Sequence, residues 1–322
     1  MSEIITLQML GEEFIAEKKA LGYKFISDSG IIRRFIRKYT AETNGDVNLS
    51  KEAVLEYTKK LFNQTDSTVC RNITVINRFS EFLNCRGYKA YIVPAKMLPK
   101  LNRNFKARIF NDEEILRLLT AANSIDYAKQ NPLKMHQVPV MFSILINCGM
   151  REAELLNLRI CDVNLNENVF TILDTKFHKN RYVPFSAVVA EEINRYLDVL
   201  KPQNGEDLLF PSPKTGGRYN NSAVNLYFRL LLRLAGIPHE GHGKGPRPHD
   251  LRHTFAVHCL NSWALSGVDL SVALPVLSRY MGHSGLSGTQ KYLQLTAQMY
   301  PDILKKLEEK YGCIVPTREG AL

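Results

Sequence analysis

Long apolar runs are missing from this sequence. No stretch approaches the roughly 18 consecutive apolar residues of a membrane-spanning helix, so such a helix is excluded. The opening residues, MSEIITLQMLGEEF, lack a basic segment followed by an apolar one, and a secretory signal peptide is therefore not expected. These absences predict a cytoplasmic protein that does not act at a membrane.

Paired cysteines and nucleotide-binding loops are missing as well. The six cysteines are scattered and form no CxxC pair, which argues against a disulfide framework and against a cysteine zinc site. There is also no Walker-type phosphate loop, no DDE-like set of carboxylates and no internal repeat. The sequence therefore predicts neither a cofactor nor a metal.

Positive charge is what the composition does contain in excess. The 42 lysines and arginines exceed the 32 acidic residues, for a net charge of +10. Residues 1–108 contribute 19 basic and 11 acidic residues, so most of the surplus lies in the first third of the chain. Such a surplus indicates a polyanionic partner, most simply nucleic acid. A cytosolic protein with a merely basic surface is the alternative that charge alone leaves open.

Apolar residues at helical spacing predict four helices in the first third of the chain. The apolar stripes are Leu7, Leu10, Phe14 and Leu21; Ile32, Phe35, Ile36 and Tyr39; Val54, Tyr57 and Leu61; and Val69, Ile73, Ile76 and Leu83. Ser50 is expected to cap the third helix, and Gly22 and Gly87 to end the first and the fourth. This block, residues 1–93, is expected to be a helical domain.

A linker and a second domain follow. Residues 94–108, PAKMLPKLNRNFKAR, hold two prolines and several basic residues but no acidic one, which favours a linker. Asn111 and Glu114 are spaced as a capping box that opens a domain over residues 109–322. Strands are predicted at 169–173 and 181–185, and helices at 112–122, 137–148, from Arg151, and at 186–200, 222–234, 249–265, 269–281, 286–298 and 301–311. The predicted fold class is mainly α with a small antiparallel β-sheet.

Three short motifs carry residues suited to phosphate chemistry. Arg151 lies in NCGMREAELLNL, His249 and Arg252 lie in HDLRHTFAVH, and His283 and Tyr292 lie in MGHSGLSGTQKY. Guanidinium groups stay protonated and present a fixed fork to phosphate oxygens. Imidazole can accept a proton near neutral pH, and a tyrosine hydroxyl can serve as a nucleophile.

This order of residues resembles the tyrosine recombinase/integrase family, whose pattern is Arg, Lys, His-x-x-Arg, His or Trp, and Tyr. The resemblance covers about residues 5–312. It implies a four-helix, SAM-like core-binding domain and an α+β catalytic domain that form a C-shaped clamp on double-stranded DNA. It further implies a homotetramer on DNA, monomeric or weakly associated when free. That tetramer exchanges strands between short inverted-repeat core sites through a Holliday junction, with neither metal nor cofactor.

The resemblance also implies a role for each motif residue. Arg151 and Arg252 would hold the scissile phosphate, and Glu154 would orient the site. His249 would be a general base and a phosphate ligand, and His283 would donate a hydrogen bond to a non-bridging oxygen. Tyr292 would attack phosphorus to leave a 3′-phosphotyrosine. The family's general acid is a lysine on the turn between two strands. Alignment of KFHKNRYVPF favours Lys176 for this role, and Lys179 on the same turn is the alternative.

Other interpretations stay open. A type IB topoisomerase-like enzyme would share the tyrosine chemistry without pairing two sites, and a DNA-binding protein could have lost catalysis. His239, His242, His249 and His253 could suggest a zinc cluster, but the glycines and prolines among them favour a loop. The biological role, Xer-like or mobile-element integration and excision, is not distinguished.

The tail after Tyr292 contains one further pattern. Ile303, Leu304, Leu307 and Tyr311 form an apolar stripe at helical spacing. The resemblance implies that this helix docks on a neighbouring protomer, and docking on its own domain is the alternative.

Overall fold

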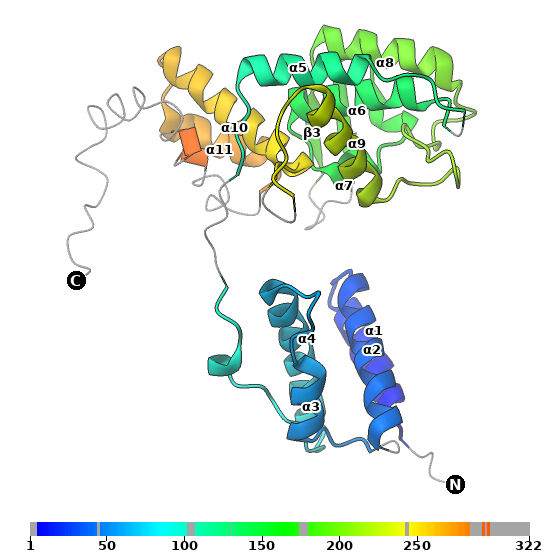
Figure 1. Ribbon diagram of the computed structural model, residues 1–322, viewed down its shortest axis with the longest axis vertical. Helices are drawn as coiled ribbons and strands as arrows, with labels where there is room; N and C mark the ends of the chain where they lie inside the picture. Colours follow the sequence, from blue (N-terminus) through cyan, green and yellow to red (C-terminus); the bar gives the residue numbers. More distant parts are fainter. Residues whose placement is uncertain are drawn as a thin grey trace, which may run out of the picture. The chain divides into compact units, whose positions relative to one another are not determined.

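The computed structural model describes residues 5–43, 46–101, 107–129, 131–173, 180–241, 245–283, 292–293 and 295–296. The chain divides into two compact units, residues 1–105 and 106–322 (Figure 1). Among the helices of these described ranges, none combines the length and apolar character that crossing a bilayer requires. Both units are mainly helical.

Among its described residues, the first unit has four α-helices. They are α1 (Leu7–Ala20), α2 (Ile26–Thr43), α3 (Lys51–Thr58) and α4 (Asp66–Cys85), followed by the short 3-10 helix η1 (Ala95–Met97). Ser50 caps α3 as expected, because its hydroxyl accepts a hydrogen bond from the Ala53 amide at 3.3 Å. Gly22, with a φ of +84°, directly follows the residue that caps α1, a backbone conformation that glycine adopts without strain.

The core of the first unit follows the predicted stripes with two exceptions. Phe14, Phe35 and Phe79 are fully buried where α1, α2 and α4 pack together. Leu21 and Leu61 are 64% and 59% exposed, so their placement in the stripes was wrong. Both residues lie beyond the ends of their helices, because α1 ends at Ala20 and α3 at Thr58, and the helical spacing no longer applies to them.

The second unit adds seven helices and a sheet within the described ranges. The helices are α5 (Asp112–Asn123), α6 (Lys134–Cys148), α7 (Glu152–Leu155), α8 (Ala187–Leu200), α9 (Asn221–Leu234), α10 (Pro248–Leu265) and α11 (Leu270–Tyr280), with the short 3-10 helix η2 (Ile160–Asp162). The predicted capping box is confirmed. The Glu114 amide donates to the Asn111 side chain at 2.8 Å, and the Asn111 amide donates to the Glu114 carboxylate at 3.1 Å.

The sheet is antiparallel, with the order β1 (Val163–Asn164), β2 (Val169–Ile172) and β3 (Arg181–Pro184). The sequence predicted β2 and β3 but missed β1, because two residues are too short to show an alternating pattern. Phe170 pairs with Val183, and both side chains are buried on the inner face. The sheet therefore has one face against the core and the other toward solvent.

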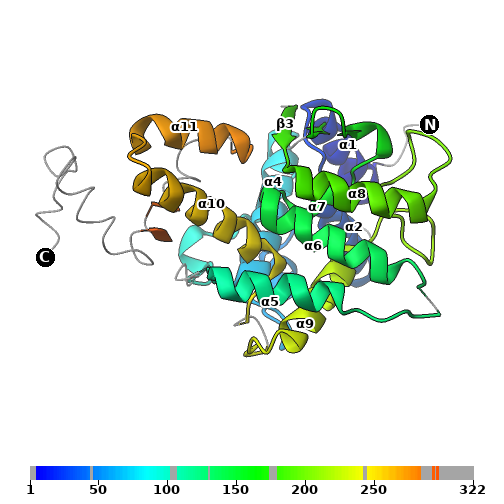
Figure 2. The ribbon, with the colours of Figure 1, turned by 90° about the horizontal axis from the view of Figure 1, so that it is seen from above.

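The main core of the second unit lies around α6. This helix packs against α5, α8 and α10, and Figure 2 shows it between α5 and α8. Phe142 on α6 stacks on Phe228 of α9, with ring centroids 5.9 Å apart. Ridges of apolar side chains from these helices form one continuous cluster with the inner face of the sheet.

A smaller cluster joins α10 to α11 and includes the Tyr292 ring. Most of the predicted helix 286–298 and all of the predicted helix 301–311 lie outside the described residues. Residues 292–293 and 295–296 are helical.

Candidate active site

The backbone turn between α6 and α7 places Arg151. Gly149 ends α6 with a φ of +57°, and a β-carbon there would lie 2.4 Å from the Phe255 ring. Glycine fits this turn because any side chain would overlap the Phe255 ring, and a residue with a side chain would be strained at this positive φ. Arg151 follows as the N-cap of α7, with its guanidinium directed toward the end of α11.

Three arginines from three different elements donate hydrogen bonds to successive carbonyls at the end of α11. The pairs are Arg181 Nε to the Tyr280 oxygen at 2.8 Å, Arg252 Nη2 to the Met281 oxygen, and Arg151 Nη2 to the Gly282 oxygen at 2.6 Å. The last carbonyls of a helix lack partners within the helix and carry its negative dipole end. The arginines therefore supply hydrogen-bond donors to these carbonyls, and the same hydrogen bonds fix the positions of the guanidinium groups.

Glu154 lies between two of these arginines. Its carboxylate accepts a bidentate pair from Arg181 at 2.9 and 2.7 Å, and a further bond from Arg151 Nη1 at 2.7 Å. Burial alone would raise the pKa of Glu154, but the hydrogen bonds and charge of Arg181, together with the hydrogen bonds of Arg151, lower that pKa to about 2. Glu154 is therefore ionised at any working pH.

Arg252 lies deeper than the other arginines and is 2% exposed. Its Nη1 donates to the Gly149 carbonyl at 2.7 Å, and its Nη2 lies 3.3 Å from His283 Nε2. Burial and the charge of Arg151 lower the pKa of Arg252 to about 10, so the group stays protonated at neutral pH. Because a guanidinium has no acceptor, His283 accepts this bond and carries its own proton on Nδ1.

Three histidines surround the arginines. Burial, reinforced mainly by the charge of Arg252, lowers the pKa values of His249 and His283 to about 4 each. The pKa of His253 is lowered to about 4 by burial and by His249 and Arg252. All three rings are therefore neutral at pH 7, although the His249 side chain still reaches solvent.

The Tyr292 side chain completes the group and is 2% exposed. Its ring stacks on His283 with centroids 5.8 Å apart and planes 21° apart, and it lies 5.5 Å from the His253 ring. His253 in turn contacts the His249 ring edge to face at 4.7 Å. Burial raises the pKa of Tyr292, and the charge of Arg252 opposes that rise.

The structure thus brings together six of the side chains that the motifs single out. They are Arg151, Glu154, His249, Arg252, His283 and Tyr292. Lys176 and Lys179, the two candidates for the general acid, lie outside the described residues. So does His242 of the zinc alternative. Within the described ranges, no group of three or more His, Cys, Asp or Glu side chains is arranged so that it could hold a metal ion.

Two residues of this site were missed by sequence reasoning. Arg181 is the first residue of β3. The signal that could have identified it was an arginine at the start of a predicted strand next to the core. His253 lies four residues after His249, hence on the same face of α10, but the sequence suggested only a zinc ligand at this position. Its Nδ1 is buried with no hydrogen-bond partner among the described residues.

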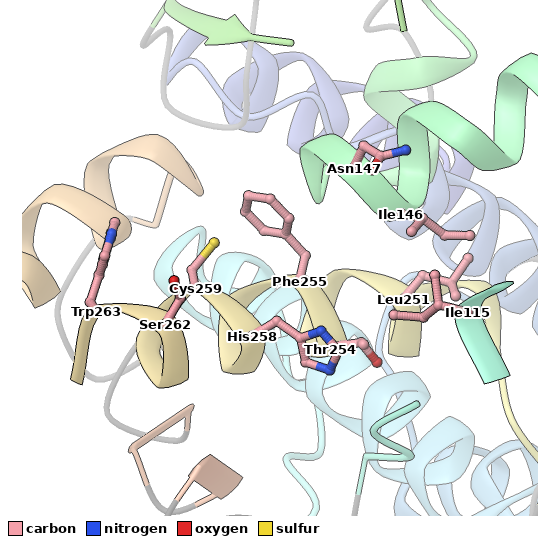
Figure 3. Close-up of a pocket in the computed structure, with 10 residues that line it drawn as sticks. All are labelled: Ile115, Ile146, Asn147, Leu251, Thr254, Phe255, His258, Cys259, Ser262 and Trp263. Carbon is pink, nitrogen blue, oxygen red and sulfur yellow. The ribbon is translucent and has the colours of Figure 1, made fainter. Parts of the chain in front are cut away.

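The other side of α10 faces a separate cavity of about 360 Å³ (Figure 3). Leu251, Phe255 and Trp263 of α10 line it together with residues of α5 and α6. Beside it, the Phe110 amide donates to Thr254 Oγ1 at 3.1 Å, which ties the segment before α5 to this helix. Helix α10 therefore carries the motif residues His249 and Arg252 in its first turns. Through Thr254 it also holds the segment that precedes α5.

The three histidines make stability depend on pH. Their folded pKa values of about 4 lie below the ordinary 6.5, so the unfolded chain binds more protons between pH 6.5 and 4. The free energy of unfolding should therefore fall as pH drops through this window. Urea titrations at pH 7, 6 and 5 measure it, and His253→Asn should reduce the slope relative to the parent. Equal slopes for His253→Asn and the parent would contradict the expectation.

Comparison with known proteins gives the same family throughout. Residues 108–299 match the phage integrase family. The chain is 30% identical to a tyrosine recombinase of Pseudothermotoga lettingae over 81% of this chain and 83% of that protein. It is 29% identical to the integrase/recombinase y4rE of Sinorhizobium fredii over 88% of this chain and 89% of the relative.

Solved structures with a similar fold include two recombinases bound to DNA. A XerH site-specific recombinase in a post-cleavage complex with palindromic difH substrate has a TM-score of 0.62 and 20% identity, covering 96% of this chain and 85% of that one. A Tn1549 transposon integrase in complex with transposon right end DNA has a TM-score of 0.61 and 15% identity, covering 96% and 100%. The chain belongs to the phage integrase family and is a tyrosine recombinase, an enzyme of site-specific recombination that cuts and rejoins DNA.

Proposed function

We propose that Tyr292 is the nucleophile of this recombinase and attacks a DNA phosphodiester held by Arg151 and Arg252. The bond from the tyrosine oxygen to phosphorus forms while the bond from phosphorus to the 5′-oxygen breaks, which leaves a 3′-phosphotyrosine and a 5′-hydroxyl. The observation that carries this proposal is the convergence of both arginines and His283 on the end of α11, directly against the Tyr292 ring.

The two arginines supply the charge that the phosphate needs. Each is anchored through one or two N–H groups to backbone carbonyls, which orients the planar guanidinium before DNA arrives. Positive charge held in a partly buried site acts more strongly on a phosphate than charge in water. In this proposal, the fixed guanidinium groups of Arg151 and Arg252 stabilise the negative charge of the transition state.

The histidines handle protons in this proposal. His249 is neutral at pH 7, so it can accept the Tyr292 phenol proton as a general base. His283 is neutral as well, and a neutral imidazole still carries the single N–H that the contact with a non-bridging oxygen requires. Glu154 orients Arg151 through the bond at 2.7 Å.

The 5′-oxygen must gain a proton as it leaves, and we assign this proton to Lys176. If Lys176 is the general acid, Lys176→Ala should cleave very slowly on normal DNA. The cleavage rate of Lys176→Ala should recover on DNA with sulfur in the 5′-bridging position, because a thiolate leaves without a proton. Single-turnover cleavage of both substrates measures this. Recovery of Lys179→Ala in place of Lys176→Ala would move the role to Lys179.

The DNA partner and the assembly complete the proposal. We assign residues 1–93 as a core-binding domain that closes a C-shaped clamp on duplex DNA with the catalytic domain, residues 94–108 being the linker. The surplus of basic residues before position 108 supports this assignment. The substrate is a pair of short inverted-repeat sites held by a homotetramer in the cytoplasm, where strands exchange through a Holliday junction. The relatives named above, a XerH recombinase and a transposon integrase, support both Xer-like and mobile-element roles.

A paired assay tests this function. Duplexes retained by the protein from a random-sequence pool identify its site, and a plasmid with two copies of that site is then the substrate. A recombinase should convert the plasmid to deletion or inversion products and form a 3′-linked covalent adduct. Relaxation of supercoils on a plasmid with no site would instead support the topoisomerase-like alternative, and binding without any adduct would support a protein that has lost catalysis.

A further inference from the structure

We propose that Arg181 is a positioning residue of the active site, which holds Glu154 so that the positive charge of Arg151 stays available to the scissile phosphate. Arg181 is 9% exposed at its side chain, and we do not place it against DNA. The inference rests on the proposed role of Arg151 as a phosphate ligand.

Arg181 and Arg151 share the Glu154 carboxylate unequally. Arg181 spans both oxygens of Glu154, with Nη1 to Oε1 at 2.9 Å and Nη2 to Oε2 at 2.7 Å. The Arg151 side chain reaches one of these oxygens, with Nη1 to Oε1 at 2.7 Å. The bidentate fork is the stronger arrangement, so Glu154 is chiefly the counter-ion of Arg181.

Arg181 also sets the net charge of the group. One carboxylate lies between two guanidiniums, so the group of three carries one net positive charge. Without Arg181, the carboxylate would pair with Arg151 alone and the pair would be neutral. A neutral pair offers a phosphate much less attraction, because the carboxylate repels the same oxygens that the guanidinium attracts. Arg181 thus prevents Glu154 from neutralising the residue it orients.

Arg181 also contacts the backbone at the end of α11. Arg181 Nε donates to the Tyr280 carbonyl at 2.8 Å, two residues before the carbonyl that accepts from Arg151. A β-carbon at Gly282 would lie 2.9 Å from Arg181 Nη1 and 3.2 Å from Arg151 Nη1, so the backbone passes closely between both guanidiniums. Arg181 therefore connects strand β3 to the turn that ends in His283. It also lies just after the segment that carries Lys176.

Variants of Arg181 and Glu154 should show an unusual pattern of cleavage rates. Arg181→Gln should lower the single-turnover cleavage rate about 100-fold, as expected when a catalytic group is drawn out of place. Adding Glu154→Gln removes the carboxylate that captures Arg151, and it leaves no buried unpaired charge. The double variant should therefore cleave faster than Arg181→Gln alone, to within about tenfold of the parent. Arg181→Lys should be intermediate, because one ammonium cannot bond both oxygens and the Tyr280 carbonyl.

A neutral substrate gives a second readout. A methylphosphonate at the scissile position lacks one non-bridging negative charge, so its cleavage depends less on Arg151. The ratio of methylphosphonate to phosphate cleavage should rise strongly for Arg181→Gln and for Arg151→Ala, and should be unchanged for Arg195→Gln. Arg195 is an exposed arginine on α8 and serves as the matched control. Circular dichroism and affinity for the selected duplex confirm that each variant is folded.

The outcomes separate cleanly. Cleavage by Arg181→Gln at the parent rate would overturn the inference. So would a double variant no faster than the single one together with an unchanged methylphosphonate ratio, since that is the pattern of a purely structural residue. If Arg181→Gln does not fold, Arg181→Lys and the double variant make the same comparison. An adduct that still forms with Tyr292→Phe would instead overturn the proposed function, whatever Arg181 does.

Discussion

Tyr292→Phe should abolish the covalent protein–DNA adduct while leaving DNA affinity almost unchanged. The substitution removes one hydroxyl, which is the proposed nucleophile, and it removes no positive charge. The Tyr292 ring is buried against His283 and His253, and phenylalanine keeps both ring contacts. Loss of a nucleophile costs on the order of 10⁴-fold or more in rate, so no adduct should accumulate.

A nicked suicide substrate makes this measurement decisive. Cleavage near the nick releases a short strand, so the parent enzyme accumulates as a 3′-linked complex that denaturing gels resolve. Tyr280→Phe is the control, because Tyr280 lies in the same unit but donates its hydroxyl to the Cys148 carbonyl at 3.0 Å. An adduct with Tyr292→Phe, or its loss with Tyr280→Phe in a folded protein, would show that the nucleophile was assigned wrongly.

Replacing Arg252 should produce the second large effect, on both stability and cleavage. Arg252→Met leaves the Gly149 and Met281 carbonyls without their buried donor. Hydrogen bonds from charged groups contribute about 1.5–3 kcal/mol each, so the free energy of unfolding should fall by about 2–4 kcal/mol after relief of the buried charge. Cleavage should fall by about 10²–10³-fold, the usual effect of removing one preorganised charge donor.

Arg252→Lys distinguishes the charge from the geometry. Lysine keeps the positive charge but cannot donate to the Gly149 carbonyl, the Met281 carbonyl and His283 from one planar group. We therefore expect a stability close to that of Arg252→Met but a smaller loss of cleavage. Urea unfolding and single-turnover cleavage measure the two effects, with Arg195→Met on α8 as the exposed control. A fully active Arg252→Lys would rule out a geometric requirement.

Local patterns in the sequence were enough to place most elements and the motif residues. Ser50 and Asn111 were identified as caps because a cap depends on neighbours within one turn of helix. The burial of Phe14 and Phe35 followed from helical spacing. The predicted burial of Leu21 and Leu61 was wrong, because helical spacing does not show where a helix ends and both residues lie beyond their helices.

The connections within the site were beyond those patterns. Arg181 reaches Tyr280, which is 99 positions away in the chain, and such a pairing leaves no periodic trace. His253 was visible as a residue, but its contacts with Tyr292 and His249 depend on how α10 packs. The residue types of the chemistry could be predicted from the sequence. Glu154, which contacts Arg151, was also predicted from its motif, but Arg181 was not, because its place in the site depends on tertiary packing.

The end of α11 gives the site one shared reference point. The carbonyls of Tyr280, Met281 and Gly282 each accept from a different arginine, and His283 is the next residue. The positions of these groups are consequently correlated. A small axial shift of α11 would move every one of them by a similar amount, whereas separate anchors would let each drift alone. The three arginines and His283 therefore keep their relative positions better than groups with separate anchors would.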